Sequence, residues 1–383
     1  MRDAEVGLAF NKAHPSSALR APHSALGLYI HIPFCHARCG YCDFVTFTHK
    51  EDQRGPYVKA LCKEIEMYGG STVSTIFFGG GTPSVLDSSH IRSIFKTLQD
   101  YVHFKLGVEI TLEANPESVT LDALNAWREV GINRLSLGLQ AYDDTLLKAM
   151  GRLHTVRQFE QAYRKARETG FNNLNIDLIY GFPTQTLRGW KETLTSTAAL
   201  KPEHISLYSL TVEENTPFGA QSVEVDADMQ AEMYAAARAF LPDKGFAQYE
   251  VSNFAQPRKE CRHNMIYWRG QNYLGLGVGA VGFVNGLRWE NQKNLHSYFK
   301  DIQAGRLPRQ AAETLTPQTR KFERLMLGLR LREGFYWPEN DPLWLSERSR
   351  LADKGYLEET HPGTWRIPDS YVPLTNQILL PFL

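Results

Sequence analysis

The stretch that decides the fold is LYIHIPFCHARCGYCDF, residues 28–44. Its first part, residues 28–34, is an apolar run that predicts a β-strand. Three cysteines, Cys35, Cys39 and Cys42, follow on one short loop. Their thiolates can ligate three irons of a [4Fe–4S] cluster, and because the loop holds no fourth cysteine, the last iron keeps an open position that can bind a reactant.

The spacing Cys-x3-Cys-x2-Cys, with the aromatic Tyr41 just before the last cysteine, resembles the signature of the radical S-adenosylmethionine (SAM) superfamily. In that superfamily the open iron is chelated by the amino and carboxylate groups of SAM. An electron from the cluster then cleaves the adjacent carbon–sulfur bond and gives a 5′-deoxyadenosyl radical. The cofactors carry this chemistry, and the protein orients and shields them.

Two other interpretations of the cysteines stay open at this point. A structural zinc site needs four closed ligands, so it would have to recruit the distant Cys261 or His263. Three unrelated buried cysteines are disfavoured, because the chain has only five cysteines in 383 residues and three of them fall within eight positions.

Composition indicates a globular protein of the reducing cytoplasm. The chain is 43% hydrophobic and 22% charged, with 42 basic and 42 acidic residues, so no net charge favours nucleic acid or an anionic membrane. An odd number of cysteines, three of them clustered, argues against a disulfide framework. We find neither a transmembrane run nor a secretory signal, and we expect residues 1–24 to form a loose tail.

Six short apolar runs recur along the chain, with intervening segments in which apolar residues are spaced three and four apart. The runs are residues 28–34, 75–79, 109–113, 135–139, 174–179 and 205–210, and the helical segments include 57–68, 91–101 and 157–168. This alternation implies right-handed crossovers and a parallel sheet. Because six units are too few for eight-stranded closure, we predict an α/β fold with an open six-stranded (β/α)6 partial TIM barrel.

The pattern changes near the C-terminus. We assign residues 25–300 to the barrel and its extension, and residues 315–383 to a small winged-helix-like domain with helices at 322–331 and 343–354, a β-hairpin and a final apolar helix. No stripe of Lys or Arg marks this domain as a phosphate-contacting surface. A DNA-binding regulator that senses iron or heme is therefore disfavoured, and we expect a packing or lid role.

Polar residues and glycines gather where the predicted strands end, which is the catalytic edge of such barrels. The second strand ends in the triple glycine of residues 79–81, which lets backbone approach a ligand closely. Other strand ends supply an acidic acceptor for hydroxyls, an amide, and a guanidinium that can pair with a carboxylate. These polar residues are Glu113, Gln140, Arg152 and Asp177.

Their placement resembles that of SAM-binding residues in the oxygen-independent coproporphyrinogen III oxidase branch of the superfamily. The resemblance implies that Tyr29 and Tyr41 line the same site. It also implies that the backbone at Gly80 and Gly81 meets the SAM amino group, and that Thr82 caps the next helix or contacts the cofactor.

A series of motifs, from about Leu28 to the C-terminus, resembles the HemW heme-chaperone family more closely. These motifs are YIHIPFC at residues 29–35, GGGTPS at 79–84, EANP at 113–116, GRLH at 151–154, YEVSNFA at 249–255 and HNMIYW at 263–268. The resemblance implies a protein that binds a [4Fe–4S] cluster, SAM and heme and passes heme to an apo-hemoprotein client.

Two departures separate this chain from the oxidase. The oxidase carries a further cysteine two positions after the third, where this chain has Phe44, and its N-terminal segment is longer than the 28 residues that precede Tyr29 here. Both differences favour the chaperone. Oxygen-independent oxidation of coproporphyrinogen III remains the alternative, so we leave open whether the protein is an enzyme and assign no catalytic residue.

By analogy with the family, the HNMIYW element at residues 263–268 is associated with heme. An imidazole there lies close in sequence to two large aromatic residues that could stack on a porphyrin, and heme iron accepts a His or Cys ligand. His263 is therefore the predicted heme ligand, with Cys261 as its rival. One further departure is Val281, where many relatives have a histidine.

The chaperone hypothesis also implies partners. We expect an electron donor for the cluster, an apo-hemoprotein client that could bring the protein to a membrane surface, and a homodimer, with no nucleic acid bound.

Overall fold

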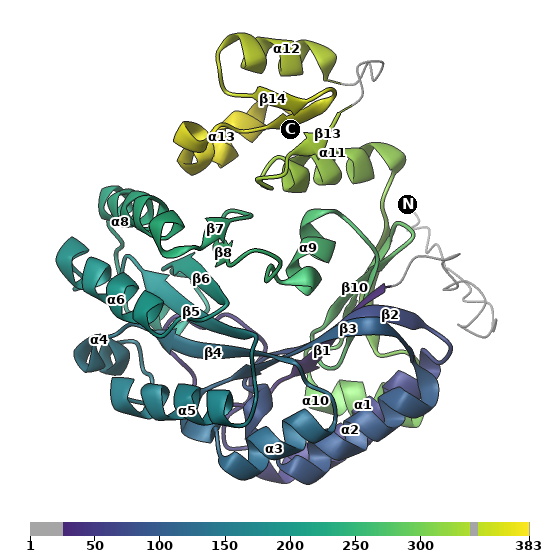
Figure 1. Cartoon of the computed structure of the whole chain (residues 1–383). Helices are drawn as coiled ribbons and strands as arrows, with labels where there is room; N and C mark the ends of the chain where they lie inside the picture. The colour runs from purple at the N-terminus through teal and green to yellow at the C-terminus, as the bar shows by residue number, and fades with distance from the viewer. Residues whose placement is uncertain (1–25, 338–343, 383) are drawn as a thin grey trace, which may run out of the picture.

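The structure, a computed structural model, describes residues 26–337 and 344–382. A curved sheet has helices along its convex side, and the C-terminal elements lie across its concave side (Figure 1). Its middle consists of the six parallel strands β1 (Leu26–Ile32), β2 (Thr72–Gly80), β3 (His103–Ala114), β4 (Arg134–Gln140), β5 (Leu174–Tyr180) and β6 (His204–Ser209). All six predicted strands are confirmed, and so is the α/β barrel fold.

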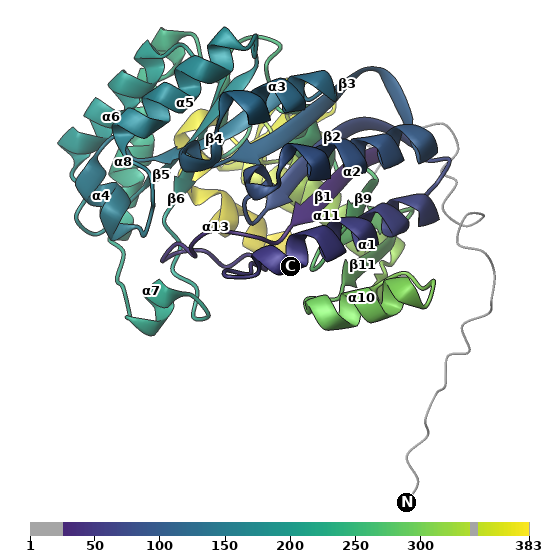
Figure 2. The ribbon, with the colours of Figure 1, turned by 90° about the horizontal axis from the view of Figure 1, so that it is seen from below.

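Helices connect these strands and cover the convex face, as the view from below shows (Figure 2). They are α1 (Arg54–Met67), α2 (Ser88–Tyr101), α3 (Leu121–Glu129), α4 (Asp144–Ala149), α5 (Val156–Glu168) and α6 (Leu187–Ala199). The helices predicted at 57–68, 91–101 and 157–168 correspond to α1, α2 and α5.

The sheet continues past the six predicted strands at both edges. Next to β1 it adds β9 (Tyr273–Leu276), which runs parallel, and then the antiparallel strands β10 (Val281–Val284), β11 (Leu287–Asn291) and β12 (Arg309–Thr314). Next to β6 it adds β8 (Asn253–Ala255) and β7 (Ala247–Gln248). The strand order begins at β12 and ends at β7, so the barrel is open, and the added strands pair backbone groups that would otherwise be exposed at its edges.

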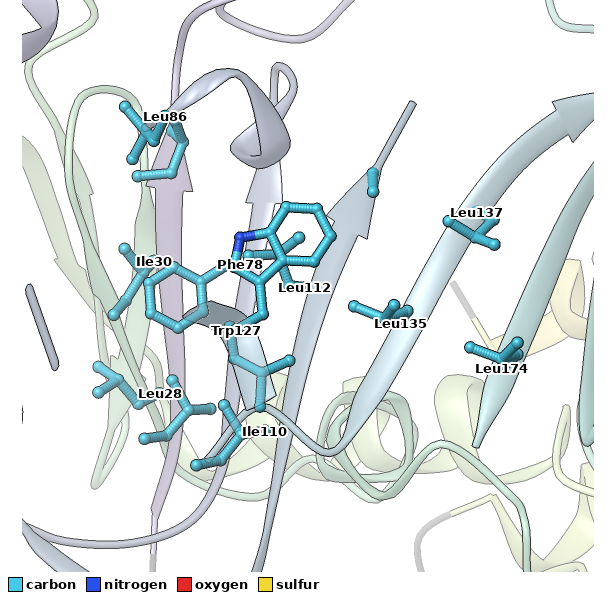
Figure 3. Close-up of a cluster of buried hydrophobic side chains, with 14 of the residues drawn as sticks. Leu28, Ile30, Phe78, Leu86, Ile110, Leu112, Trp127, Leu135, Leu137 and Leu174 are labelled. Atoms are coloured by element: carbon cyan, nitrogen blue, oxygen red, sulfur yellow. The ribbon is translucent and has the colours of Figure 1, made fainter. Parts of the chain in front are cut away.

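The pleat of the parallel strands separates an apolar face from a polar one. Leu28, Ile30, Phe78 and Leu112 pack on the convex side with the buried Trp127 of α3 (Figure 3). Successive side chains of a strand point to opposite faces. The intervening residues, such as Glu113, Ser136 and Asp177, therefore point to the concave side, where they line cavities.

Four further helices lie in the sequence between β6 and the C-terminal elements. They are α7 (Pro217–Ala220), α8 (Ala227–Phe240), α9 (Arg262–Trp268) and α10 (Leu295–Gln303). Within residues 26–337 and 344–382, no helix has the length and apolar character needed to cross a bilayer.

The C-terminal elements have a hydrophobic cluster of their own, which includes Leu325, Trp337 and Ile367. They are α11 (Pro317–Gly328), α12 (Leu345–Asp353), α13 (Thr375–Leu379) and a sheet in the order β13 (Phe335–Tyr336), β15 (Thr364–Arg366), β14 (Glu358–His361). This agrees with the predicted order of helix, helix and hairpin. The domain limits 25–300 and 315–383 stay a prediction, and the tail at 1–24 lies outside the described residues.

A fully buried carboxyl connects α1 to the extension of the barrel. Glu64 accepts hydrogen bonds from the backbone N–H of Gly277 (2.8 Å), the hydroxyl of Tyr298 (2.6 Å) and the amide of Asn291 (2.7 Å). Burial raises the pKa of Glu64 to about 7, although these donors oppose the shift. The segment from 277 to 298 is therefore fixed to the first helix of the barrel.

We expect Glu64→Ala to lower the free energy of unfolding by about 3 kcal/mol, because it removes the acceptor that three buried donors share. Glu66→Ala, on the exposed side of the same helix, is the matched control and should change stability by less than about 0.5 kcal/mol. Urea unfolding followed by circular dichroism measures both variants. Equal stability of the two would contradict this account of the Glu64 contacts.

Candidate functional site

The carboxyl ends of the barrel strands surround a pocket of about 540 Å³. We call it the strand-end pocket. Its walls include Cys35, Cys39, Cys42, Tyr41, Gly80, Gly81, Thr82, Glu113, Gln140, Arg152 and Asp177. All three predicted cluster cysteines and most of the predicted SAM residues are thus brought to one cavity.

The cysteine loop begins directly after β1 and is closed at its base. The backbone N–H of Cys35 donates to the carbonyl of Phe47 (3.1 Å), and Phe34 and Phe47 form a β-bridge. Inside the loop, the N–H of Cys42 donates to the carbonyl of Cys39 (3.2 Å). All three thiols are free of disulfides, so they are available to a cluster.

A close approach by a distant segment fixes the middle of this loop. The N–H of Phe218, in α7, donates to the carbonyl of Gly40 (2.8 Å). A Cβ at Gly40 would collide with the ring of Phe218, which also packs near Tyr41 with 6.4 Å between ring centroids. Only glycine allows this contact, a constraint that the sequence analysis did not identify.

The donor set fits a four-iron cluster better than a single ion. Among the described residues, no three His, Cys, Asp or Glu side chains converge on one metal position. In a [4Fe–4S] cluster each cysteine ligates a different iron, so the thiolates need not converge. Burial raises the pKa of the Cys35 thiol to about 11, which means that a bound cation would be needed to hold it as a thiolate.

The described structure gives no support to the zinc alternative. Cys261 is fully buried and its thiol lies 3.7 Å from the carboxylate of Glu109, while both ring nitrogens of His263 have hydrogen-bond partners. Neither residue lines the strand-end pocket. The cluster cysteines therefore have no fourth protein ligand from either residue.

Arg152 reaches the cysteine loop from the segment after α4. Its guanidinium donates to the sulfur of Cys39 (3.6 Å), to Oδ1 of Asn115 (2.7 Å) and to the carbonyl of Gly138 (3.2 Å). Its Nε is buried and has no hydrogen-bond partner among the described residues. This guanidinium beside a thiol can pair with the carboxylate of a ligand.

Two carboxyls form another part of the wall. The pKa of Glu113 is raised to about 8, by burial first and then by the charge of Asp177. The pKa of Asp177 is also raised by burial, although Ser136 (2.8 Å) and Asn175 (2.8 Å) donate to its oxygens. Both carboxyls offer acceptor oxygens for ligand hydroxyl groups.

Backbone conformation is unusual at two predicted ligand residues. Gln140 has φ of +69° and Gly80 has φ of +106°. A non-glycine residue in the left-handed region is uncommon, and such strain gathers at binding sites. Gln140 lies where the pairing of β4 with β5 is irregular, which turns its side chain toward the pocket.

Thr82 does not cap the following helix through its side chain. Its hydroxyl instead lies 3.2 Å from the sulfur of Cys35 and accepts from the amide of Asn115 (3.3 Å). Of the two roles expected for Thr82, the capping role is wrong, and the residue connects the glycine turn to the cysteine loop.

Tyr29 lies outside the strand-end pocket. It lines a deeper cavity of about 280 Å³, which we call the interior cavity, together with His263, Phe77 and Arg134. The Tyr29 hydroxyl is 3.0 Å from Nδ1 of His31, and its ring stacks on Phe77. The two cavities adjoin, because Phe44, Gly80, Glu113, Ser136, Asp177 and Tyr208 line both.

His263 is almost completely buried, with 1% of its surface exposed. Its Nδ1 lies 2.8 Å from the hydroxyl of Thr75 and its Nε2 lies 2.8 Å from the hydroxyl of Tyr267. Burial, and then the charge of Arg134, lowers the pKa of His263 to about 3. Iron ligation by His263 would require one of these hydrogen bonds to break, and this ligand role stays a prediction.

The two aromatic residues after His263 do not form one wall. Tyr267 lines the interior cavity, whereas Trp268 packs with Tyr249, Met265 and Leu331. Helical geometry explains the difference, because adjacent residues of a helix point in directions about 100° apart.

Sequence reasoning missed several residues that line the strand-end pocket. They include Asn115, Ser136, Tyr208, Ser209 and Glu213. Tyr208 and Ser209 end β6, so the rule that chemistry gathers at strand ends could have identified them. Ser136 lies inside a strand and carried no such signal.

Residues 29–196 match the family model of the radical SAM superfamily. The chain is 36% identical to the heme chaperone HemW of Synechocystis sp., over 86% of this chain and 85% of that protein. It is 33% identical to HemW of Bacillus subtilis, over 88% and 94%. Against HemW of Escherichia coli K12 the identity is 37%, over 68% and 70%.

Among solved structures, the chain is similar to coproporphyrinogen III oxidase (HemN) of Escherichia coli, described as a radical SAM enzyme. The TM-score is 0.82 at 26% identity, and the match covers 95% of this chain and 91% of that one. Radical SAM proteins use a [4Fe–4S] cluster and SAM, which agrees with the three thiols and the polar wall of the strand-end pocket. Given its identity to these chaperones over most of their length, the chain belongs to the HemW family of the radical SAM superfamily.

Proposed function

We propose that this protein is a heme chaperone that binds a [4Fe–4S] cluster, SAM and heme and delivers heme to apo-hemoproteins. The observation that carries the proposal is the strand-end pocket, where three free thiols meet a guanidinium and two carboxyls. It occurs in a chain that is 36% identical to a protein named as a heme chaperone, over 86% of the chain.

In this proposal, each cofactor has protein groups of matching chemistry. Cys35, Cys39 and Cys42 would hold the cluster, and Arg152 would pair with the SAM carboxylate. Glu113 and Asp177 offer acceptors for its ribose hydroxyls. When bound and reduced, the cluster can supply an electron to the carbon–sulfur bond of SAM.

The wall around the thiols would limit access of water. Phe218 covers Gly40, and Tyr41 packs beside it. Arg152 holds the sulfur of Cys39 on the other side of the loop. These contacts orient the loop before any cofactor binds, which lowers the ordering cost of binding.

The proposal includes partners and a location. The protein would work in the cytoplasm, receive electrons from a separate donor, form a homodimer, and contact a membrane only through a client. The chain has 42 basic and 42 acidic residues, so its net charge does not attract a partner. We therefore expect local surfaces to recognise the client and the electron donor.

A second candidate function is oxygen-independent oxidation of coproporphyrinogen III. The fold similarity to HemN, with a TM-score of 0.82, favours it. Phe44 opposes it, because this position holds a cysteine in the oxidase, and here the aromatic side chain is 65% exposed. Turnover of coproporphyrinogen III by the reconstituted protein would decide for the oxidase.

We expect Cys39→Ala to abolish the [4Fe–4S] cluster, because it removes one of the three thiolates that hold it. Anaerobic reconstitution, followed by absorbance and by iron and sulfide analysis, measures the effect. Cys62→Ala is the matched control, since Cys62 lies on α1 outside the strand-end pocket, and it should keep the full iron content. A normal cluster in Cys39→Ala would refute the assignment of the loop.

We expect the cluster-reconstituted protein to bind heme saturably, with about one heme per chain, in an anaerobic titration followed by absorbance. A chaperone must hold its cargo in a specific site, whereas nonspecific association rises without saturation. Saturable binding without coproporphyrinogen turnover supports the chaperone. Absence of saturable binding would move the assignment to the oxidase.

A further inference from the structure

A second surface cavity, of about 550 Å³, lies between α11 and the small three-stranded sheet near the C-terminus. We call it the aromatic groove and define it by Arg320, Arg324, Phe335, Tyr336, Trp337 and Trp344. Figure 1 shows α11 beside β13, on the concave side of the barrel sheet. The volume falls in the range of sites for drug-sized ligands, about 300–1,000 Å³.

The floor of the groove is buried, whereas one wall is exposed. Trp337 is 1% exposed and packs against the rings of Phe335 and Phe382, at 6.3 and 5.6 Å between centroids. Trp344 packs against Phe322 and Phe382. Tyr336, by contrast, has 65% of its surface exposed. Tyr336 and the partly buried Trp344 therefore offer aromatic surface to a ligand in the groove.

The rim of the groove is cationic. Arg320 and Arg324 are four residues apart on α11, so they lie on the same face of the helix, and both are exposed. In the described parts of the chain neither forms an ion pair, whereas the neighbouring Glu323 on α11 pairs with Arg288. No acidic residue occurs among the described residues that line the groove.

Two glycines give room to the stems of these arginines. A Cβ at Gly286 would lie 3.3 Å from Cδ of Arg320, and a Cβ at Gly270 would lie 2.9 Å from Cγ of Arg324. Arg320 also lies over the ring of Phe283, at 5.9 Å. Because their stems rest on the barrel extension, the guanidinium groups are partly ordered before a ligand binds.

We propose that the aromatic groove binds heme, with the ring against Tyr336 and Trp344 and the two propionates paired with Arg320 and Arg324. A flat apolar ring with two carboxylates matches aromatic walls beside two guanidinium groups that form no ion pair with any described residue. The inference rests on the proposed chaperone function, and it locates the cargo on the C-terminal elements, away from the buried His263.

The test is an anaerobic heme titration of the full, cluster-reconstituted chain. Reversing both rim charges, in Arg320→Glu with Arg324→Glu, should weaken heme binding at least about tenfold, because two charge-assisted pairs become repulsive. The matched control is Arg157→Glu with Arg164→Glu on α5. It reverses two exposed arginine charges outside the groove and should leave the affinity unchanged.

Heme dimethyl ester, in which both carboxylates are esterified and uncharged, tests whether the rim arginines contact the propionates of heme. Wild type should bind the ester more weakly than heme, and the rim variant should bind heme and ester with similar affinity. Tyr336→Ala should weaken both ligands, because it removes a wall of the groove. Circular dichroism confirms that each variant is folded.

Three results would overturn the proposal. If the rim variant binds heme as wild type does while His263→Ala loses binding, the groove assignment fails and the chaperone function stands. If wild type binds ester and heme equally, the carboxylates are not recognised and the rim has no role. If wild type binds no heme saturably, the chaperone function fails and the groove assignment fails with it.

Discussion

The pleat of the parallel strands is the constraint on which the rest of this structure depends. On β4 the buried Leu135 and Leu137 face the convex side, while Arg134, Ser136 and Gly138 face the concave side. Because the side-chain period of a strand is two residues, a shift of one residue in register would exchange these sets. Helix packing on the apolar face therefore also fixes which polar groups enter the cavities.

The polar interior that results is extensively hydrogen-bonded. His204 contacts Asn175 (2.6 Å) and Tyr249 (2.8 Å) through its two ring nitrogens. Glu109 accepts from the backbone N–H groups of Arg262 (3.2 Å) and His263 (3.0 Å). Buried polar groups are costly unless they are satisfied, and a satisfied network selects one arrangement. The strand-end pocket therefore rests on a stable layer, which suits residues that must keep fixed positions around a cofactor.

The open barrel and the C-terminal elements provide two different environments for ligands. The strand-end pocket is bordered by thiols and carboxyls, whereas the aromatic groove has aromatic walls and a cationic rim. In the proposed function, cofactors and cargo would occupy separate sites. Separation would let cargo leave from the surface while the cysteine loop stays covered by Phe218.

The sequence by itself determined the cysteine loop, the six parallel strands and the polar residues at their ends, because these depend on local spacing and on hydrophobic period. It did not predict that Phe218 packs on Gly40, or that the hydroxyl of Thr75 lies within hydrogen-bond distance of a ring nitrogen of His263. Nor did it separate Tyr29 from the strand-end pocket. Such contacts join residues up to 188 positions apart. Only the tertiary structure decides them, because a local period indicates which face a side chain takes but not which distant residue it meets there.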